Sequence, residues 1–223
     1  MKGLILDNFY KTINSMKLFV LFVIGAGIAL LVTGNDTLLE LFVYIAITAL
    51  SVTALSGMRK DSDAKWNKYE LTLPVTRKHI ISSKYISYLF WVFAGTVIAL
   101  VFTGLVVIIH GNVFVYGFRD VFRIWISGYF SLFTLGIGIA VMVGALFYPL
   151  AYLLGADKSE TLLVISVISS VGLAIFLIWL ANRGIGSEAE YYYMRLGAFI
   201  LTCFLMYLAS YFIAHSIYKN KEF

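Results

Sequence analysis

Six long apolar runs, separated by shorter polar segments, dominate this chain of 223 residues. A helix needs about 20 apolar residues to cross the roughly 30 Å of hydrocarbon in a bilayer. Runs such as Leu163–Leu180 show no alternation of apolar and polar positions, whereas strands of membrane barrels do alternate. The pattern therefore predicts an all-α, polytopic membrane protein. The six expected membrane helices cover residues 18–34, 37–57, 86–109, 121–148, 161–181 and 194–215.

The composition argues against a soluble protein. Hydrophobic residues make up 61% of the chain and charged residues 13%, so a soluble fold would expose an untenable apolar surface. The net charge of +5 does not indicate a nucleic-acid partner, because basic residues beside membrane helices report topology and contact with anionic lipid. We therefore expect membrane lipid, and no nucleic acid, around this chain.

The distribution of Lys and Arg predicts the orientation in the membrane. If residue 1 is cytoplasmic, the segments on that side hold thirteen of the seventeen Lys and Arg residues, including every lysine. Cytoplasmic segments are enriched in these residues, so both termini, including the tail 216–223, are expected in the cytoplasm. Tyr85, Tyr88 and Tyr148 fall near the expected cytoplasmic ends of their helices, where aromatic side chains often lie at the headgroup level.

The first 17 residues have the pattern of an amphipathic helix. Ile5, Phe9, Ile13 and Met16 recur at helical spacing, and most polar residues fall elsewhere on the helical wheel. Such a helix would lie in the inner headgroup layer and brace the first span. The alternative is an unstructured basic leader.

Residues 58–85 form the long polar insert between the second and third apolar runs and hold seven of the seventeen Lys and Arg residues. Trp66, Tyr69 and Leu73 share one face of a short predicted helix. Pro74 should end this helix, because proline disfavours helical geometry in the residue before it. The aromatic face either docks a soluble partner or anchors in the lipid headgroups.

Small residues at steps of four occur in the third and fourth apolar runs, which cover part of the region 86–215. Such stripes allow helix backbones to approach closely, within one chain or between two subunits. We expect Pro149 to end the fourth helix. The small residues are Gly95, Ala99, Gly136, Ala140 and Gly144.

The apolar runs lack the groups that ion coupling or catalysis requires. Transporters driven by ions usually carry ionisable residues near the bilayer midplane, but Glu40 and His110 fall near the outer ends of their runs. The sequence also lacks zinc-protease and serine-hydrolase motifs, and Cys203 is the only cysteine. We therefore expect a non-catalytic membrane subunit with no metal.

The order of these features resembles the small permease subunits of type-2 ABC transporters. The segment Trp66–Tyr85 reads W-x-x-Y-E-L-x-L-P-V-x-R-x-x-I-x-x-S-K-Y and lies between spans two and three, after an N-terminal elbow at 1–17 and the first two spans at 18–57. Among such permeases, the chain is most similar to those that export phenol-soluble modulins and related antimicrobial or amphipathic peptides.

The resemblance implies that the insert is a coupling helix, which docks in a groove of a separate ATP-binding subunit. It implies an assembly of two permeases and two ATPases in a bacterial plasma membrane. ATP and Mg²⁺ would be bound by the partner, and no cofactor by this chain. The implied contact residues are Trp66, Asn67, Tyr69, Glu70, Leu73, Pro74 and Arg77.

The resemblance also implies an amphipathic peptide as substrate, although an uncharged interior would receive a lipid or a lipophilic drug equally well. A non-transporting membrane scaffold or sensor would share the same topology. In the family, a short segment between spans five and six lies outside and can act as a gate; the alternative is an ordinary interfacial loop. The residues of this expected outer gate are Glu188, Glu190, Tyr191 and Tyr192.

Overall fold

The computed structural model describes residues 2–58, 61, 76–110, 118–185 and 191–219 of the chain. Every element in these ranges is helical, as the apolar runs predicted. The elements are α1 (Lys2–Thr33), α2 (Asp36–Leu55), α5 (Arg77–His110), α7 (Phe118–Leu154), the short 3-10 helix η1 (Ala156–Lys158), α8 (Ser159–Ile185) and α9 (Tyr192–Lys219).

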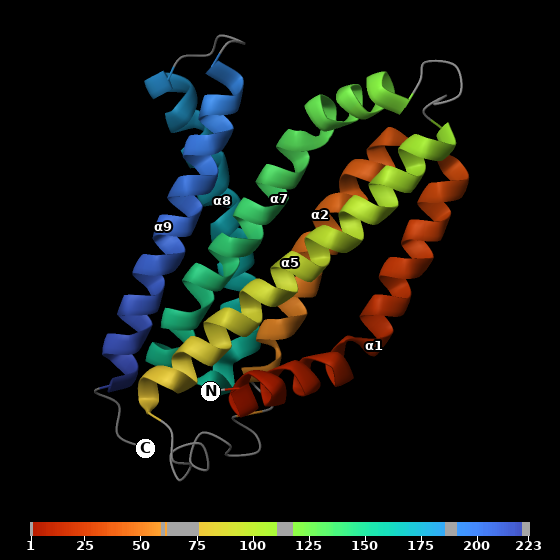
Figure 1. Cartoon of the computed structure of the whole chain (residues 1–223). Helices are drawn as coiled ribbons and strands as arrows, with labels where there is room; N and C mark the ends of the chain where they lie inside the picture. The colour runs from red at the N-terminus through yellow and green to blue at the C-terminus, as the bar shows by residue number, and fades with distance from the viewer. Residues whose placement is uncertain (1, 59–60, 62–75, 111–117, 186–190, 220–223) are drawn as a thin grey trace.

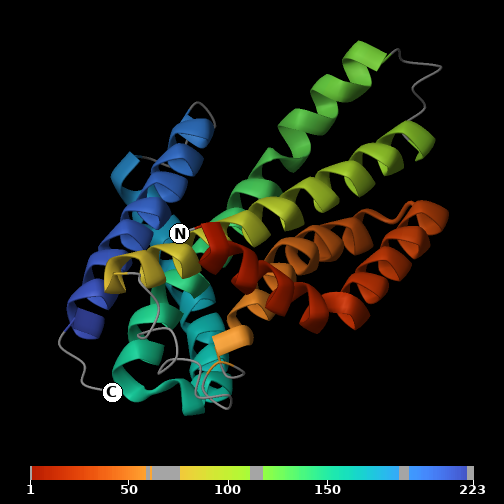
Figure 2. The ribbon, with the colours of Figure 1, turned by 60° about the horizontal axis from the view of Figure 1, so that its bottom comes forward.

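The helices form a bundle in which α7 is central, because it packs against α2, α5, α8 and α9. Figure 1 shows α8 and α9 on one side of α7, with α2, α5 and α1 on the other. The start of α1, the start of α5 and the end of α9 lie together (Figures 1 and 2). We call this end of the bundle, marked by Arg77 and Lys219, the basal end. The distal end is marked by Thr33, His110 and Tyr192.

Helix α1 bends partway along its length, so that its first part crosses the basal end and its second part runs along the bundle (Figure 1). The apolar face predicted for residues 1–17 is partly used inside the protein. Met16 is buried with Leu50 and Trp91, and the ring of Phe9 stacks on that of Trp91 at 5.1 Å. The first part of α1 is therefore packed on α2 and α5.

Five helical stretches of the described residues are long and apolar enough to cross a membrane. They confirm a multi-pass helical membrane protein, whereas the sequence predicted six spans. The expected span at 18–34 appears as the shorter apolar stretch Phe19–Thr33, so the sixth span stays a prediction. The five stretches are Asp36–Leu55, Arg77–His110, Gly128–Leu154, Ala156–Ile185 and Tyr192–Lys219.

The prediction that Pro149 ends the fourth helix is wrong. Pro149 lies inside α7, which continues to Leu154. Proline removes one helical hydrogen bond, but membrane helices tolerate this loss where neighbouring groups satisfy the freed backbone. Helix α7 ends instead at Leu154, and the next residue, Gly155, has a φ of 98° in the region that favours glycine. Its amide still donates to the carbonyl of Ala151 at 3.1 Å.

Candidate functional site

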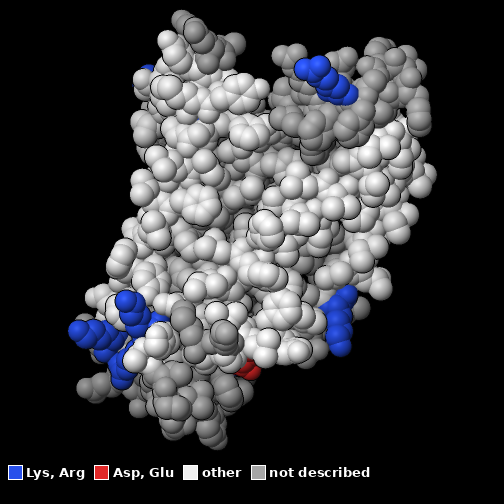
Figure 3. Space-filling view, in the orientation of Figure 1, with Lys and Arg blue, Asp and Glu red and all other residues white. Residues whose placement is uncertain are grey.

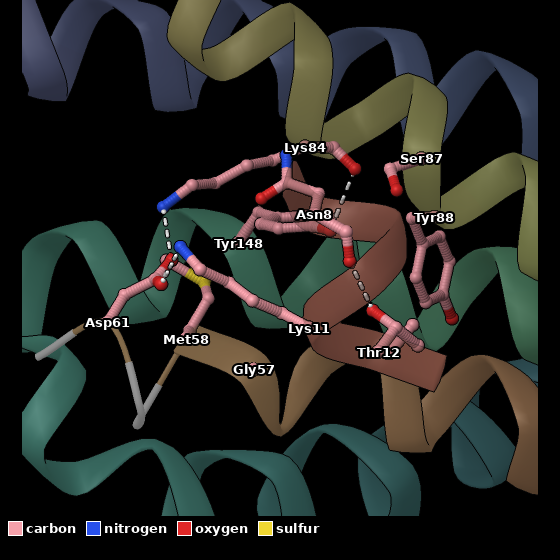
Figure 4. A pocket seen from close by; sticks show the side chains of 11 residues that line it. Asn8, Lys11, Thr12, Gly57, Met58, Asp61, Lys84, Ser87, Tyr88 and Tyr148 are labelled. Carbon is pink, nitrogen blue, oxygen red and sulfur yellow. Dashed lines mark hydrogen bonds and ion pairs between the residues drawn. The ribbon is translucent and has the colours of Figure 1, made fainter. Parts of the chain in front are cut away.

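Three charged side chains meet inside the basal end of the bundle. The carboxylate of Asp61 accepts from Lys11 Nζ at 2.9 Å and from Lys84 Nζ at 3.3 Å. Figure 4 shows both lysine side chains converging on this carboxylate, one from α1 and the other from α5. The side chains of Asp61 and Lys84 are only 5% and 6% exposed. We call Lys11, Asp61 and Lys84 the Asp61 junction.

The charges of the junction are compensated locally. Lys11 also pairs with Asp7, one helical turn earlier on α1, at 2.7 Å, so these two acids and two lysines together carry no net charge. Burial lowers the pKa of Lys11, but the carboxylates of Asp7 and Asp61 raise it by more, and the resulting pKa is above the usual 10.5. Lys11 is therefore positively charged at neutral pH.

Polar groups around the junction hold the same helices together. Asn8 Nδ2 donates to Ser83 Oγ at 3.4 Å, which links α1 to α5. Tyr148 Oη donates to the carbonyl of Lys84 at 3.1 Å, which links α7 to α5. A cavity of about 30 Å³ adjoins these side chains, which is room for about one water molecule.

Buried tyrosines extend this polar network from α5 to α9. Tyr85 Oη lies 2.8 Å from Ser210 Oγ, and Tyr207 Oη donates to the carbonyl of Tyr85 at 2.9 Å. The rings of Tyr85 and Tyr148 stack at 4.5 Å. The sequence placed Tyr85, Tyr88 and Tyr148 at the headgroup level, but all three are at most 4% exposed. Each of the three lies on the side of its helix that faces the other helices of the bundle.

Arg77 is the one predicted ATPase-contact residue in the described part of the chain. It begins α5, and its guanidinium donates to the carbonyls of Tyr218 and Lys219 at 3.1 and 2.8 Å. A cation is favourable at the C-terminal end of a helix, so Arg77 ties the start of α5 to the end of α9. Its contact with an ATPase stays a prediction. Outside the described residues lie Trp66, Asn67, Tyr69, Glu70, Leu73 and Pro74.

The small residues of the third and fourth apolar runs lie between helices of the same chain. A Cβ atom on Gly95 would sit 2.7 Å from the carbonyl oxygen of Ala46 and 3.1 Å from Cα of Ile47, so α5 and α2 cross backbone to backbone. A Cβ atom on Gly136 would sit 3.1 Å from Ile47 Cδ1, and one on Gly144 would overlap the ring of Tyr88. Ala99 and Ala140 are fully buried. These positions face the interior of the chain, away from its outer surface.

An apolar groove of about 560 Å³ lies between α5, α7 and α9. Figure 3 shows that the face of the molecule seen in Figure 1 carries no charged side chain across its middle, while Lys and Arg gather toward its ends. Several large side chains of the groove are well exposed, among them Phe93 at 66% and Phe204 at 41%. The groove is lined by Leu89, Val92, Phe93, Thr96, Phe130, Thr134, Ile137, Val141, Tyr193, Leu196, Gly197, Ile200 and Phe204.

The distal end contains part of the expected outer gate. Tyr191 precedes α9 and is 39% exposed, and Tyr192 begins that helix. Arg195 donates to Asn182 Oδ1 at 3.0 Å, which connects α9 to α8. Glu188 and Glu190 lie outside the described residues, so gating stays a prediction.

The described residues contain no group of three or more His, Cys, Asp or Glu side chains that could hold a metal ion. Sequence reasoning missed the Asp61 junction, because its three residues come from separate regions of the chain. The available signal was a lysine at position 84, which lies on the same side of its helix as the apolar residues Ile80, Ile81 and Tyr88. A buried lysine at such a position needs an acidic partner.

Together, the described helices form a multi-pass membrane protein with an uncharged, apolar groove along its bundle. Residues 3–219 match the family described as ABC-2 family transporter protein, and the chain belongs to this family. It is therefore a membrane transport component of an ABC transporter, in which ATP hydrolysis lies with a partner chain. Neither the curated proteins nor the solved structures include a match to this chain.

Proposed function

We propose that this chain is the permease subunit of an ATP-driven exporter that moves amphipathic peptides out of the cell. Two copies would work with two ATP-binding chains, in a bacterial plasma membrane. The observation that carries the proposal is the apolar groove between α5, α7 and α9, in a chain that belongs to the ABC-2 transporter family.

The chemistry of the groove supports an amphipathic substrate. Phe93, Phe130 and Phe204 provide apolar surface, and the hydroxyls of Thr96 and Thr134 add two small polar groups. An amphipathic helix already partitions into the membrane interface, so its apolar face can enter the groove from the side. A volume of about 560 Å³ holds a few side chains of such a helix, which fits a second permease copy completing the path.

The lysine distribution supports a cytoplasmic basal end. Lys11, Lys78, Lys84 and Lys219 all belong to this end of the bundle, and cytoplasmic segments are enriched in Lys and Arg. The insert 58–85 then emerges on the side where ATP is available. Movement of this insert by the ATPase would switch the groove between inward and outward access.

Reconstitution with its ATP-binding partner tests this function. We expect the complex in proteoliposomes to hydrolyse ATP faster than the ATPase alone, and to transport a fluorescent amphipathic helical peptide. Transport of a fluorescent phospholipid but not the peptide would contradict the peptide assignment. Failure to bind or stimulate the ATPase would instead favour a membrane scaffold or sensor.

Replacing the predicted contact residue Trp66 tests the route of coupling. Buried aromatic residues often dominate interfaces, so Trp66→Ala should weaken ATPase association by about 2 kcal/mol or more. Titrating labelled ATPase against the permease in nanodiscs measures this loss. Trp179→Ala is a matched control, because Trp179 lies in α8 near the distal end and is 48% exposed. Equal affinity of the Trp66 variant and the wild type would contradict the contact.

A further inference from the structure

We propose that Asp61 is a positioning residue for energy coupling, whose buried carboxylate makes α1 and α5 move with the insert that the ATPase displaces. This inference rests on the proposed function, because it requires an ATPase acting on the insert. It assigns a role to three residues, Lys11, Asp61 and Lys84, whose contacts are described above.

The position of Asp61 in the chain is the first argument. Asp61 lies close to the end of α2, within the insert 58–85, and Arg77 begins α5 sixteen residues later. A force applied to the insert therefore reaches the bundle at these two places. At Asp61 it passes directly to Lys11 of α1 and Lys84 of α5, through contacts of 2.9 and 3.3 Å.

The other contacts between α1 and α5 provide the second argument. Asn8 donates to Ser83 at 3.4 Å, and Phe9 stacks on Trp91 at 5.1 Å. These two contacts hold the helices together without involving Asp61. Asp61 adds a side-chain connection from the segment after α2 to both helices. Its loss should remove this connection while the pairing of α1 with α5 persists.

The physics of buried charge supplies the third argument. Apolar residues of similar size often stabilise a protein as well as a buried ion pair does, so a buried ion pair is weak evidence for a role in stability alone. Ion pairs do differ from apolar contacts in resisting separation, because an isolated charge in a low-dielectric interior is costly. The nearly complete burial of Asp61 and Lys84 therefore favours a link that withstands movement.

The experiment measures movement and hydrolysis separately. The permease–ATPase complex is reconstituted in nanodiscs, with Cys203 replaced by Ser and spin labels attached at Tyr10→Cys and Leu153→Cys. Both label sites are exposed, at 60% and 61%, on α1 and on α7. Pulsed electron paramagnetic resonance then gives the distance between α1 and α7 without nucleotide and with ATP and vanadate.

We expect the wild-type complex to show a nucleotide-dependent shift in this distance. In Asp61→Asn the shift should fall at least threefold, while ATPase association and ATP hydrolysis stay within twofold of the wild type. Asp61→Glu should restore the shift, because it restores the charge. Lys84→Gln is measured in the same way, with Lys78→Gln as its matched control. Lys78 is an exposed lysine on the same helix, so Lys78→Gln should leave the shift unchanged.

A variant with the charges removed and the volume kept separates coupling from stability. The combined substitutions Asp61→Leu, Lys11→Met and Lys84→Met should assemble with the ATPase and still lose the shift. A wild-type shift in this variant, or in Asp61→Asn, would overturn the inference. If Asp61→Asn does not insert into the membrane, Lys84→Gln and the combined variant test the inference instead. A wild-type shift in either of them would overturn it.

The failure of the proposed function has a different signature. A wild-type chain that binds no ATPase, or shows no shift with nucleotide, would contradict the proposed function and this inference with it. A wild-type shift that persists in the Asp61 variants would contradict the inference alone.

Discussion

The basal and distal ends of the bundle are held together by different kinds of contact. At the basal end, the Asp61 junction, Arg77 and the buried tyrosines connect α1, α5, α7 and α9 through hydrogen bonds and ion pairs. Toward the distal end, α5, α7 and α9 border an apolar groove of about 560 Å³. The ion pairs and buried tyrosine contacts are therefore concentrated where the insert joins the bundle, whereas α5, α7 and α9 leave a groove between them further away.

The largest expected difference between the ends concerns buried charge. Asp61→Ala leaves Lys84 almost fully buried without this carboxylate, and breaking a buried ion pair in this way costs about 3–5 kcal/mol. At the distal end, Asp36→Ala removes an exposed acid from the first turn of α2, which should cost at most about 1 kcal/mol. Unfolding in SDS of the purified permease measures both. Equal losses of stability for the two variants would contradict this difference between the basal and distal ends.

Close helix crossing should give the next largest effect. Gly95→Ala places a Cβ atom 2.7 Å from the carbonyl oxygen of Ala46, and such overpacking costs about 1–3 kcal/mol. Gly104 lies on the same helix nearer the distal end, with open space around a new Cβ atom. Gly104→Ala should be neutral or stabilise by up to about 1 kcal/mol. The same unfolding assay applies, and a stabilising Gly95→Ala would contradict the crossing.

Removing a single buried hydroxyl from α9 should have a smaller effect on stability than the two changes above. Tyr207→Phe removes the buried donor to the carbonyl of Tyr85, 2.9 Å away, and should destabilise by about 0.5–1.5 kcal/mol. Tyr193→Phe changes an exposed tyrosine beside the groove and should stay within about 0.5 kcal/mol of the wild type. Hydrogen exchange of the α9 amides would reveal the difference, which should be confined to Tyr207→Phe.

The smallest expected effect is the pH dependence contributed by Lys11. Its pKa in the folded protein lies above 10.5, so its contribution to stability is fully present below that value. The contribution is lost only as the pH rises through the raised pKa. Between pH 6 and 9, the wild type and Lys11→Met should therefore show parallel unfolding curves. A difference between them that grows across this range would contradict the raised pKa.

Much of the fold follows from local patterns. Helix formation in the apolar runs was predictable, because backbone polar groups in a bilayer must be satisfied within the helix. The end of α7 was less predictable, because this helix continues past Pro149 to Leu154. Membrane helices tolerate an internal proline where neighbouring groups satisfy the freed backbone.

The candidate site was less accessible from the sequence. The positions of Arg77 and the glycines could be identified, but Lys11, Asp61 and Lys84 come from three separate regions of the chain. Nothing in the spacing of these residues predicts their meeting. Lys84 lies on the apolar side of α5 and therefore indicated a need for an acidic partner, without indicating which one.

The sequence by itself determined that this chain is a helical membrane protein, because runs of apolar residues have few other stable arrangements in a bilayer. The tertiary structure decided which side chains face each other. It buried tyrosines expected at the headgroup level, and it brought two lysines from distant helices onto Asp61. The physical reason is that helix formation depends on neighbours along the chain, whereas the pairing of buried charges depends on how the helices cross.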